Sequence, residues 1–260
     1  MSPNRPDILF VMTDQQRFDT IADLGNPRIY TPNLDRLVRR GLTFSKAYAS
    51  CPVCVAARYM IRTGCEPPTT RVFSNSAPKP VVGQAEKMEE RCGRYLGRTM
   101  AGLGYRIFGI GKFHTAPWNE DLGYEILLRS EELYSAVTRN GDAYASWLSR
   151  EHPEFDFLEQ PLGERSEMYY IPQRSPLPAQ LGVEAWVADR AVEQIPIRLT
   201  PVPTSDLFLL WDRIRHSRLQ FHLIGCMIRT VCRIRFAAVL RTITWTKKFR
   251  ICSTRFGLTR

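Results

Sequence analysis

The feature that most constrains the fold is an unbroken apolar run near the start of the chain, from Ile8 to Met12, followed by Thr13 and Asp14. A strand with one solvated face alternates apolar and polar residues, whereas a strand covered on both faces is apolar throughout. The run therefore predicts a central strand in a sheet that has helices on both faces.

Helix and strand signals alternate after this run. The pair Thr31-Pro32 is typical of a helix start, and Gly64 and Pro196 each follow a segment with helical spacing of apolar residues. The predicted helices cover residues 32–40, 55–62, 96–103 and 184–195. A second strand is predicted over residues 105–110. This alternation predicts an α/β fold with a central, largely parallel sheet flanked by helices.

Polar residues follow both predicted strands. Asp14 comes directly after the first strand, and Lys112 and His114 come shortly after the second. In open α/β folds, ligands bind beyond the carboxyl ends of the parallel strands. We therefore expect these three side chains to lie at one edge of the sheet, in a functional site.

The net charge of +10 is unevenly distributed. Residues 197–260 contain 13 Lys and Arg against two acids, whereas residues 1–196 contain 23 basic and 24 acidic residues. The tail also has no convincing series of helix or strand signals. We predict two regions, 1–196 and a basic tail, 197–260, and we hypothesise that the reading frame changes near Pro196.

The cysteines and the apolar segments indicate the cellular setting. Of seven cysteines, Cys51 and Cys54 form a C-x-x-C pair, but no second pair completes a structural zinc site. The apolar run at Ile8 is too short for a secretory signal, and no segment has the roughly 20 uncharged apolar residues of a transmembrane helix. We expect reduced thiols, no membrane span and a cytoplasmic protein.

Five blocks of sequence share their order and spacing with those of one protein family. The blocks are Arg5–Gln16, Thr31–Leu37, Cys54–Arg58 with Thr63-Gly64, Gly111–His114 and Trp186–Ala191. Together they resemble the type I sulfatases of the alkaline phosphatase superfamily. The resemblance spans about residues 5 to 195, so it implies the N-terminal part of the family fold, with the later half missing or replaced.

This resemblance implies a sulfuric ester hydrolase. In the family a separate formylglycine-generating enzyme oxidises the signature cysteine, here Cys54. One hydroxyl of the hydrated aldehyde attacks the sulfate ester, and the other then expels sulfate, so covalent catalysis divides one difficult displacement into two steps. The predicted position at a helix start agrees with this role, because helix N-termini favour anions.

The family's site residues correspond to particular positions here. By resemblance, Asp14, Gln15 and Cys54 would ligate a divalent cation, Ca²⁺ or another. Arg58 would hold the hydrate, Lys112 would neutralise sulfate, and His114 would hydrogen-bond to the formylglycine hydroxyl. Two positions depart from the usual pattern, since Gln15 replaces an acid and Ala56 replaces the signature proline.

The resemblance leaves other functions open. Related enzymes hydrolyse phosphonate monoesters or phosphodiesters with the same nucleophile and metal. The chain could also be an inactive truncated domain, because the family's remaining metal ligands come from its later half; we therefore predict weak or absent activity. The partners expected are a sulfate ester and the maturation enzyme. No specific nucleic acid is predicted, although the basic tail could bind nucleic acid or anionic membranes.

Overall fold

The structure is a computed structural model that describes residues 7–14, 16–75, 88–131, 141–155, 177–194 and 206–213. The predictions made for Gln15 and for most of the basic tail lie outside these residues. The described strands are β1 (Ile8–Asp14), β2 (Arg106–Gly111), β3 (Ile126–Arg129) and β4 (Asp206–Arg213). They form one sheet in the order β1-β4-β2-β3, and every neighbouring pair is parallel.

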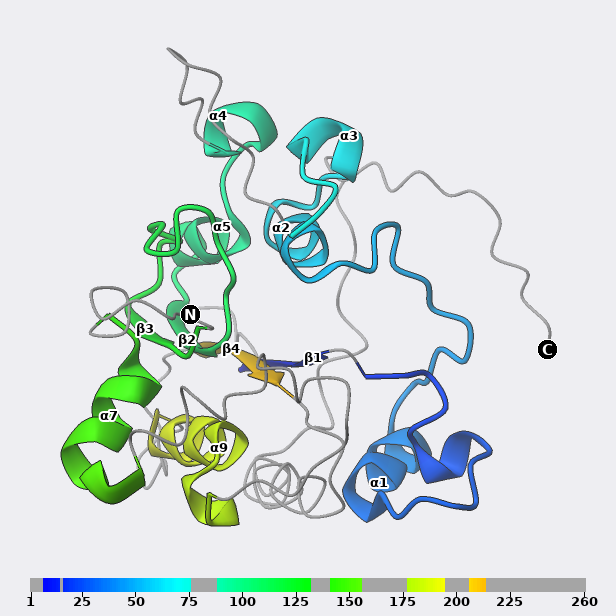
Figure 1. The fold of residues 1–260 in the computed structure, drawn as a ribbon. Helices are drawn as coiled ribbons and strands as arrows, with labels where there is room; N and C mark the ends of the chain where they lie inside the picture. The colour runs from blue at the N-terminus through cyan, green and yellow to red at the C-terminus, as the bar shows by residue number, and fades with distance from the viewer. Residues whose placement is uncertain are drawn as a thin grey trace, which may run out of the picture.

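Helices follow the strands along the chain and cover both faces of the sheet. The α-helices are α1 (Pro32–Arg40), α2 (Cys54–Thr63), α3 (Pro67–Thr70), α4 (Met88–Cys92), α5 (Leu96–Gly102), α7 (Ala143–Glu151) and α9 (Val183–Gln194). The described residues also include short 3-10 helices, η1 (Ala22–Leu24), η2 (Pro153–Phe155) and η4 (Ala179–Leu181). Figure 1 shows α2 and α5 on one side of the sheet and α7 and α9 on the other. The predicted α/β fold is thereby confirmed.

Strand β1 explains why its sequence is apolar at every position. Alternate side chains of a strand point to opposite faces. Ile8, Phe10 and Met12 pack against the core that includes α2, whereas Leu9 and Val11 pack against the core that includes α7 and α9. Both faces of β1 are therefore covered. Its predicted central place is corrected, however, because β1 is an edge strand of the described sheet and its residues are only half-buried.

Strand β4 corrects a second prediction. The sequence signals gave no strand after Pro196, yet Asp206–Arg213 pairs with β1 on one side and with β2 on the other. Leu209, for example, is in register with both Phe10 and Gly109. The sheet thus uses eight residues of the predicted basic tail. The proposed change of reading frame stays a hypothesis.

No helix in the described parts of the chain is both long enough and apolar enough to cross a bilayer.

Candidate active site

The site lies where β1 and β2 end. Asp14 is the last residue of β1, and Lys112 directly follows the last residue of β2. Both strands are parallel to β4, which lies between them, so their carboxyl ends meet at the same edge of the sheet. Cys54 reaches this edge from a different element, as the first residue of α2.

The carboxylate of Asp14 is the centre of the site. The Lys112 Nζ lies 2.7 Å from its Oδ2, and an Arg58 guanidinium nitrogen lies 3.6 Å from its Oδ1. The thiol of Cys54 points at the same carboxylate, with Sγ 3.7 Å from Oδ1. The Asp14 carboxylate therefore contacts both the Cys54 thiol, which is the predicted nucleophile precursor, and two cationic side chains.

Both cations of the site are buried, which sets the local charge balance. The Lys112 and Arg58 side chains are 3% and 1% exposed, and that of Asp14 is 13% exposed. Burial lowers the pKa of Arg58, and the negative charge of Asp14 opposes that shift. Two buried cationic side chains therefore lie against the carboxylate of Asp14.

Helix α2 positions Cys54 and Arg58 together. They are four residues apart, which places them on the same helix face. Gly64 ends the helix in the left-handed conformation, with φ 69°, and its N–H donates to the Met60 carbonyl. At the other end, the Val55 N–H donates to Asn75 Oδ1 at 3.1 Å. The helix is thus fixed at both ends, and its first turn holds Cys54 at the sheet edge.

The segment after β2 is held by two arginines of α2. Arg58 donates to the Lys112 carbonyl, and Arg62 donates to the Phe113 carbonyl at 2.7 Å. Because these bonds go to the main chain, they fix where the segment carrying Lys112 and His114 runs. His114 itself has φ 53°, in the left-handed region. That conformation costs a residue with a Cβ about 1 kcal/mol or more, so surrounding contacts must impose it.

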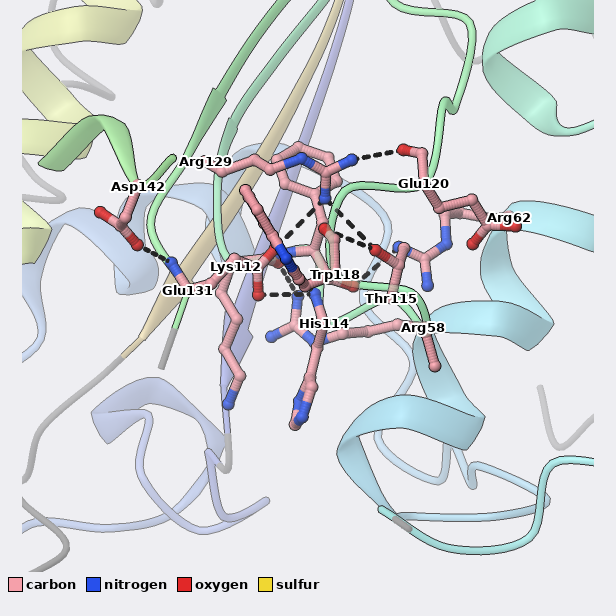
Figure 2. A network of polar contacts seen from close by, with 12 residues as sticks. Arg58, Arg62, Lys112, His114, Thr115, Trp118, Glu120, Arg129, Glu131 and Asp142 are labelled. Carbon is pink, nitrogen blue, oxygen red and sulfur yellow. Dashed lines mark hydrogen bonds and ion pairs between the residues drawn. The ribbon is translucent and has the colours of Figure 1, made fainter. Parts of the chain in front are cut away.

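A buried acidic network lies behind this segment (Figure 2). The Glu131 carboxylate accepts from the N–H groups of Phe113 and His114, and Arg129 lies 3.5 Å from it. The Glu131 N–H in turn donates to the carboxylate of Asp142. Glu120 accepts from the hydroxyls of Tyr59 and Tyr95. Burial is the largest cause of the raised pKa of both tyrosines, so they stay neutral donors.

The structure brings together four of the predicted site residues: Asp14, Cys54, Arg58 and Lys112. For His114, Figure 2 shows its ring extending in the same direction as the Lys112 side chain, away from the Arg129 network. The roles assigned to these residues stay predictions, and Gln15 lies outside the described residues. Sequence reasoning missed Arg62 and Glu131. The spacing of Arg62, four residues after Arg58, is a usable signal, whereas Glu131 has none.

The described residues by themselves supply too few oxygen ligands for a calcium site. Calcium takes about six to eight oxygen ligands. Asp14 is a carboxylate that contacts the thiol, and both of its oxygens face cationic side chains. Across the described parts of the chain, no group of three or more His, Cys, Asp or Glu could hold a metal. Of the predicted metal ligands, Asp14 and Cys54 lie together in the described part of the chain, and Gln15 lies outside it.

The fold and the site define a class of protein. A parallel α/β sheet carries, at its carboxyl edge, a thiol at a helix start beside a carboxylate and two buried cations. This is a parallel α/β fold with a cluster of charged side chains and a thiol at the carboxyl edge of its sheet.

Comparison with known proteins agrees with this class. The family model named Sulfatase matches residues 6–168. An arylsulfatase of Clostridium perfringens is 30% identical over 140 residues, which are 54% of this chain and 27% of that protein. An ulvan-active sulfatase of Formosa agariphila is 32% identical over 112 residues, 43% of this chain and 20% of the relative. The crystal structure of the phosphonate monoester hydrolase of Agrobacterium radiobacter has a TM-score of 0.53 at 22% identity, covering 79% of this chain and 41% of that one.

The chain belongs to the sulfatase family, because the family model covers more than half of it. The sequence-based assignment to this family is confirmed. The aligned part of the chain spans about a quarter of the length of the two curated relatives. The likeness to the phosphonate monoester hydrolase shows a shared fold and says nothing of substrate.

Proposed function

We propose that this chain carries the nucleophile part of a sulfuric ester hydrolase site, in which Cys54 is the precursor of formylglycine. The proposal is carried by one observation, the position of the Cys54 Sγ 3.7 Å from the Asp14 carboxylate that also contacts Lys112 and Arg58. Membership of the sulfatase family supports the same function.

The cationic residues and the carboxylate of the site would have different roles. Lys112 and Arg58 would attract the sulfate group of an ester and hold its oxygens, since both cations are buried and oriented in advance. Preorganised charges of this kind stabilise the charge that develops on the oxygens in the transition state. Asp14 would accept a hydrogen bond from the nucleophile position and keep it aimed at the sulfur.

The covalent chemistry would come from the modification of Cys54. As formylglycine hydrated by water to a geminal diol, this residue would supply one hydroxyl that attacks sulfur and displaces the alcohol of the ester. The second hydroxyl would then lose its proton and re-form the aldehyde as the C–O bond to sulfate breaks. The place of Cys54 suits such a group, because it is the first residue of α2 and the positive end of a helix dipole favours an anion. His114 would hydrogen-bond to the hydroxyl, and calcium would be the metal of the complete family site.

The first prediction is the test of this proposal. The chain is produced together with a formylglycine-generating enzyme, the Cys54 peptide is analysed by mass spectrometry, and turnover of an aryl sulfate is measured. We expect an aldehyde at Cys54 and slow turnover, because the family's remaining metal ligands come from its later half, which the resemblance does not cover. Cys54→Ala should abolish both signals, whereas Cys51→Ala, in the same C-x-x-C pair, should keep them.

The outcome also separates sulfate from phosphonate chemistry. An aryl phosphonate monoester is offered to the same preparation, and the two rates are compared. Faster hydrolysis of the sulfate supports the proposal, and faster hydrolysis of the phosphonate replaces it. A thiol that stays unmodified, with inorganic sulfate bound equally well by wild type and Lys112→Met, would show that the site does not act on sulfate at all.

A further inference from the structure

We propose that Glu131 is a positioning residue that holds the backbone of His114 in the left-handed conformation and so keeps its ring on the same side of the segment as the Lys112 side chain. The proposal rests on the function proposed above, because it gives His114 a direction that matters only if the site binds an anion.

The contacts of Glu131 are specific to two consecutive main-chain N–H groups. Its Oε1 lies 2.8 Å from the nitrogen of Phe113 and 3.0 Å from that of His114, and its Oε2 lies 2.8 Å from the nitrogen of His114. Successive N–H groups around a residue with positive φ form a small concave anion site. Here the occupant is a side chain of the same protein.

The Glu131 side chain is itself held firmly. It is 3% exposed, and Arg129 lies 3.5 Å from its Oε1. The Ser130 N–H donates to the Gly111 carbonyl at 2.8 Å, which continues the pairing of β3 with β2 up to the residue before Glu131. The Glu131 N–H donates to Asp142, the N-cap residue of α7. The carboxylate therefore has a fixed place relative to the end of β2.

This fixed carboxylate acts on the segment that carries two predicted catalytic residues. The two N–H groups that donate to Glu131 are those of Phe113 and His114, and Lys112 directly precedes them in the chain. Arg58 and Arg62 bind the carbonyls of Lys112 and Phe113 from the opposite side. The segment is thus held by its carbonyls from α2 and by its N–H groups from Glu131. Because the left-handed φ of His114 sets the direction of its Cβ, the N–H bonds to Glu131 would fix the point and direction from which the ring leaves the backbone, and the ring lies on the same side as the Lys112 side chain (Figure 2).

The test uses Glu131→Gln, which keeps the shape of the side chain, together with Glu131→Ala. The control is Glu125→Gln. Glu125 directly precedes β3, and its half-exposed carboxylate contacts Arg106. Nuclear magnetic resonance follows hydrogen exchange at the amides of Phe113 and His114 and the His114 ring signals. We expect exchange at both amides to accelerate at least about tenfold in each Glu131 variant, and the ring signals to move, because each amide loses a charged acceptor. The control should match wild type.

A double-mutant cycle separates positioning from general support of the fold. The dissociation constant for inorganic sulfate is measured in wild type, Glu131→Gln, His114→Ala and the double variant. If Glu131 acts through His114, its substitution weakens binding about tenfold in wild type and less than about twofold in the His114→Ala background. Equal losses in both backgrounds would reduce Glu131 to a structural residue and overturn the proposal.

The two proposals fail in different ways. If wild type binds no sulfate, the proposed function fails, and the amide and ring signals still decide whether Glu131 holds His114. The proposal for Glu131 fails alone in a different case. There sulfate binds, but both Glu131 variants keep the wild-type exchange rates at the Phe113 and His114 amides and the wild-type ring signals of His114.

Discussion

At the scale of single residues, the site depends on buried arginines that bind main-chain carbonyls. Arg62 is 2% exposed, donates to the Phe113 carbonyl at 2.7 Å and lies over the Tyr59 ring, 4.7 Å from its centroid. A buried guanidinium is costly unless it is well bonded. Its place next to the end of β2 therefore links the stability of the chain to the geometry of the site.

The second prediction concerns this link. Arg62→Ala removes a buried hydrogen bond and leaves a cavity beneath Phe113, so we expect it to lower the free energy of unfolding by about 2–4 kcal/mol. Urea unfolding measures the loss. Arg40→Ala, at the exposed end of α1, serves as the control and should change stability by less than about 0.5 kcal/mol. An unchanged unfolding midpoint for Arg62→Ala would contradict the argument.

At the scale of elements, the start of α7 is joined to the site by one carboxylate. Asp142 caps α7 by accepting from the Ala145 N–H at 2.8 Å, and it also accepts from the Glu131 N–H. Burial raises the pKa of Asp142 to about 6, although the N–H groups that it accepts from oppose the shift. Protonation of the Asp142 carboxylate would therefore affect the start of α7 and Glu131, and through Glu131 the end of β2.

The third prediction is a pH dependence of stability with a defined sign. In the unfolded chain the pKa of an Asp is about 3.9, so between pH 4 and 6 the folded state binds the extra proton. This contribution is fully present below about pH 4 and is lost as the pH rises through about 6. Asp142→Asn keeps the cap. Relative to this variant, the free energy of unfolding of wild type should fall by on the order of 2 kcal/mol from pH 4 to 7. The free energy of unfolding of both proteins is measured in urea at several pH values. The same pH dependence in the two proteins would contradict this prediction.

Strand β4 is the element that unites the sheet. It pairs with β1 on one side and β2 on the other, so it separates and aligns the two strands that end in Asp14 and Lys112. The distance between these two side chains therefore depends on a strand that lies far along the chain from both.

The fourth prediction tests this dependence with Leu209→Pro. Proline removes an N–H from a strand that is paired on both sides, and it is rarely tolerated there. We expect loss of cooperative unfolding and of sulfate binding, followed by circular dichroism and titration. Leu209→Val keeps the N–H and should remain close to wild type. A folded, sulfate-binding proline variant would mean that β4 is not needed to align the site.

At the scale of the whole molecule, the segment before α2 differs from the rest. Large apolar side chains are exposed along it, namely Phe18, Leu24, Tyr30, Leu37, Leu42, Phe44 and Tyr48. The buried residues of α1 are instead the polar Asn33 and Asp35. Neither of the two main hydrophobic cores includes a residue of α1. Exposed apolar surface of this kind is typical of interaction sites or of a tendency to aggregate.

The fifth prediction is that the chain associates with itself through this segment. Sedimentation velocity should show larger species as the protein concentration rises, because association removes apolar surface from water. Replacing Phe44 and Tyr48, which are 70% and 89% exposed, by Ser should shift the distribution toward the monomer. The matched control is Leu103→Ser, 54% exposed at the end of α5. Equal effects of the two variants would argue against a role for the segment.

The sequence alone determined the features that depend on neighbouring residues. The apolar run of β1, the start of α1 at Pro32 and the end of α2 at Gly64 follow from local periodicity and from the backbone preferences of proline and glycine. The family blocks also predicted four residues that the structure brings together, because a strand end or a helix start limits where a side chain can reach.

Only the tertiary structure decided how these pieces meet. The pairing of β4 between β1 and β2 joins segments almost 200 residues apart along the chain, and an eight-residue strand in a tail without other signals gives no indication of its partners. The contact of Glu131 with the main chain of His114 is equally invisible in the sequence, since any acid between β3 and α7 has the same local pattern. Strand pairing and buried hydrogen bonds depend on what lies across the fold, and their geometry is fixed only when the sheet has formed.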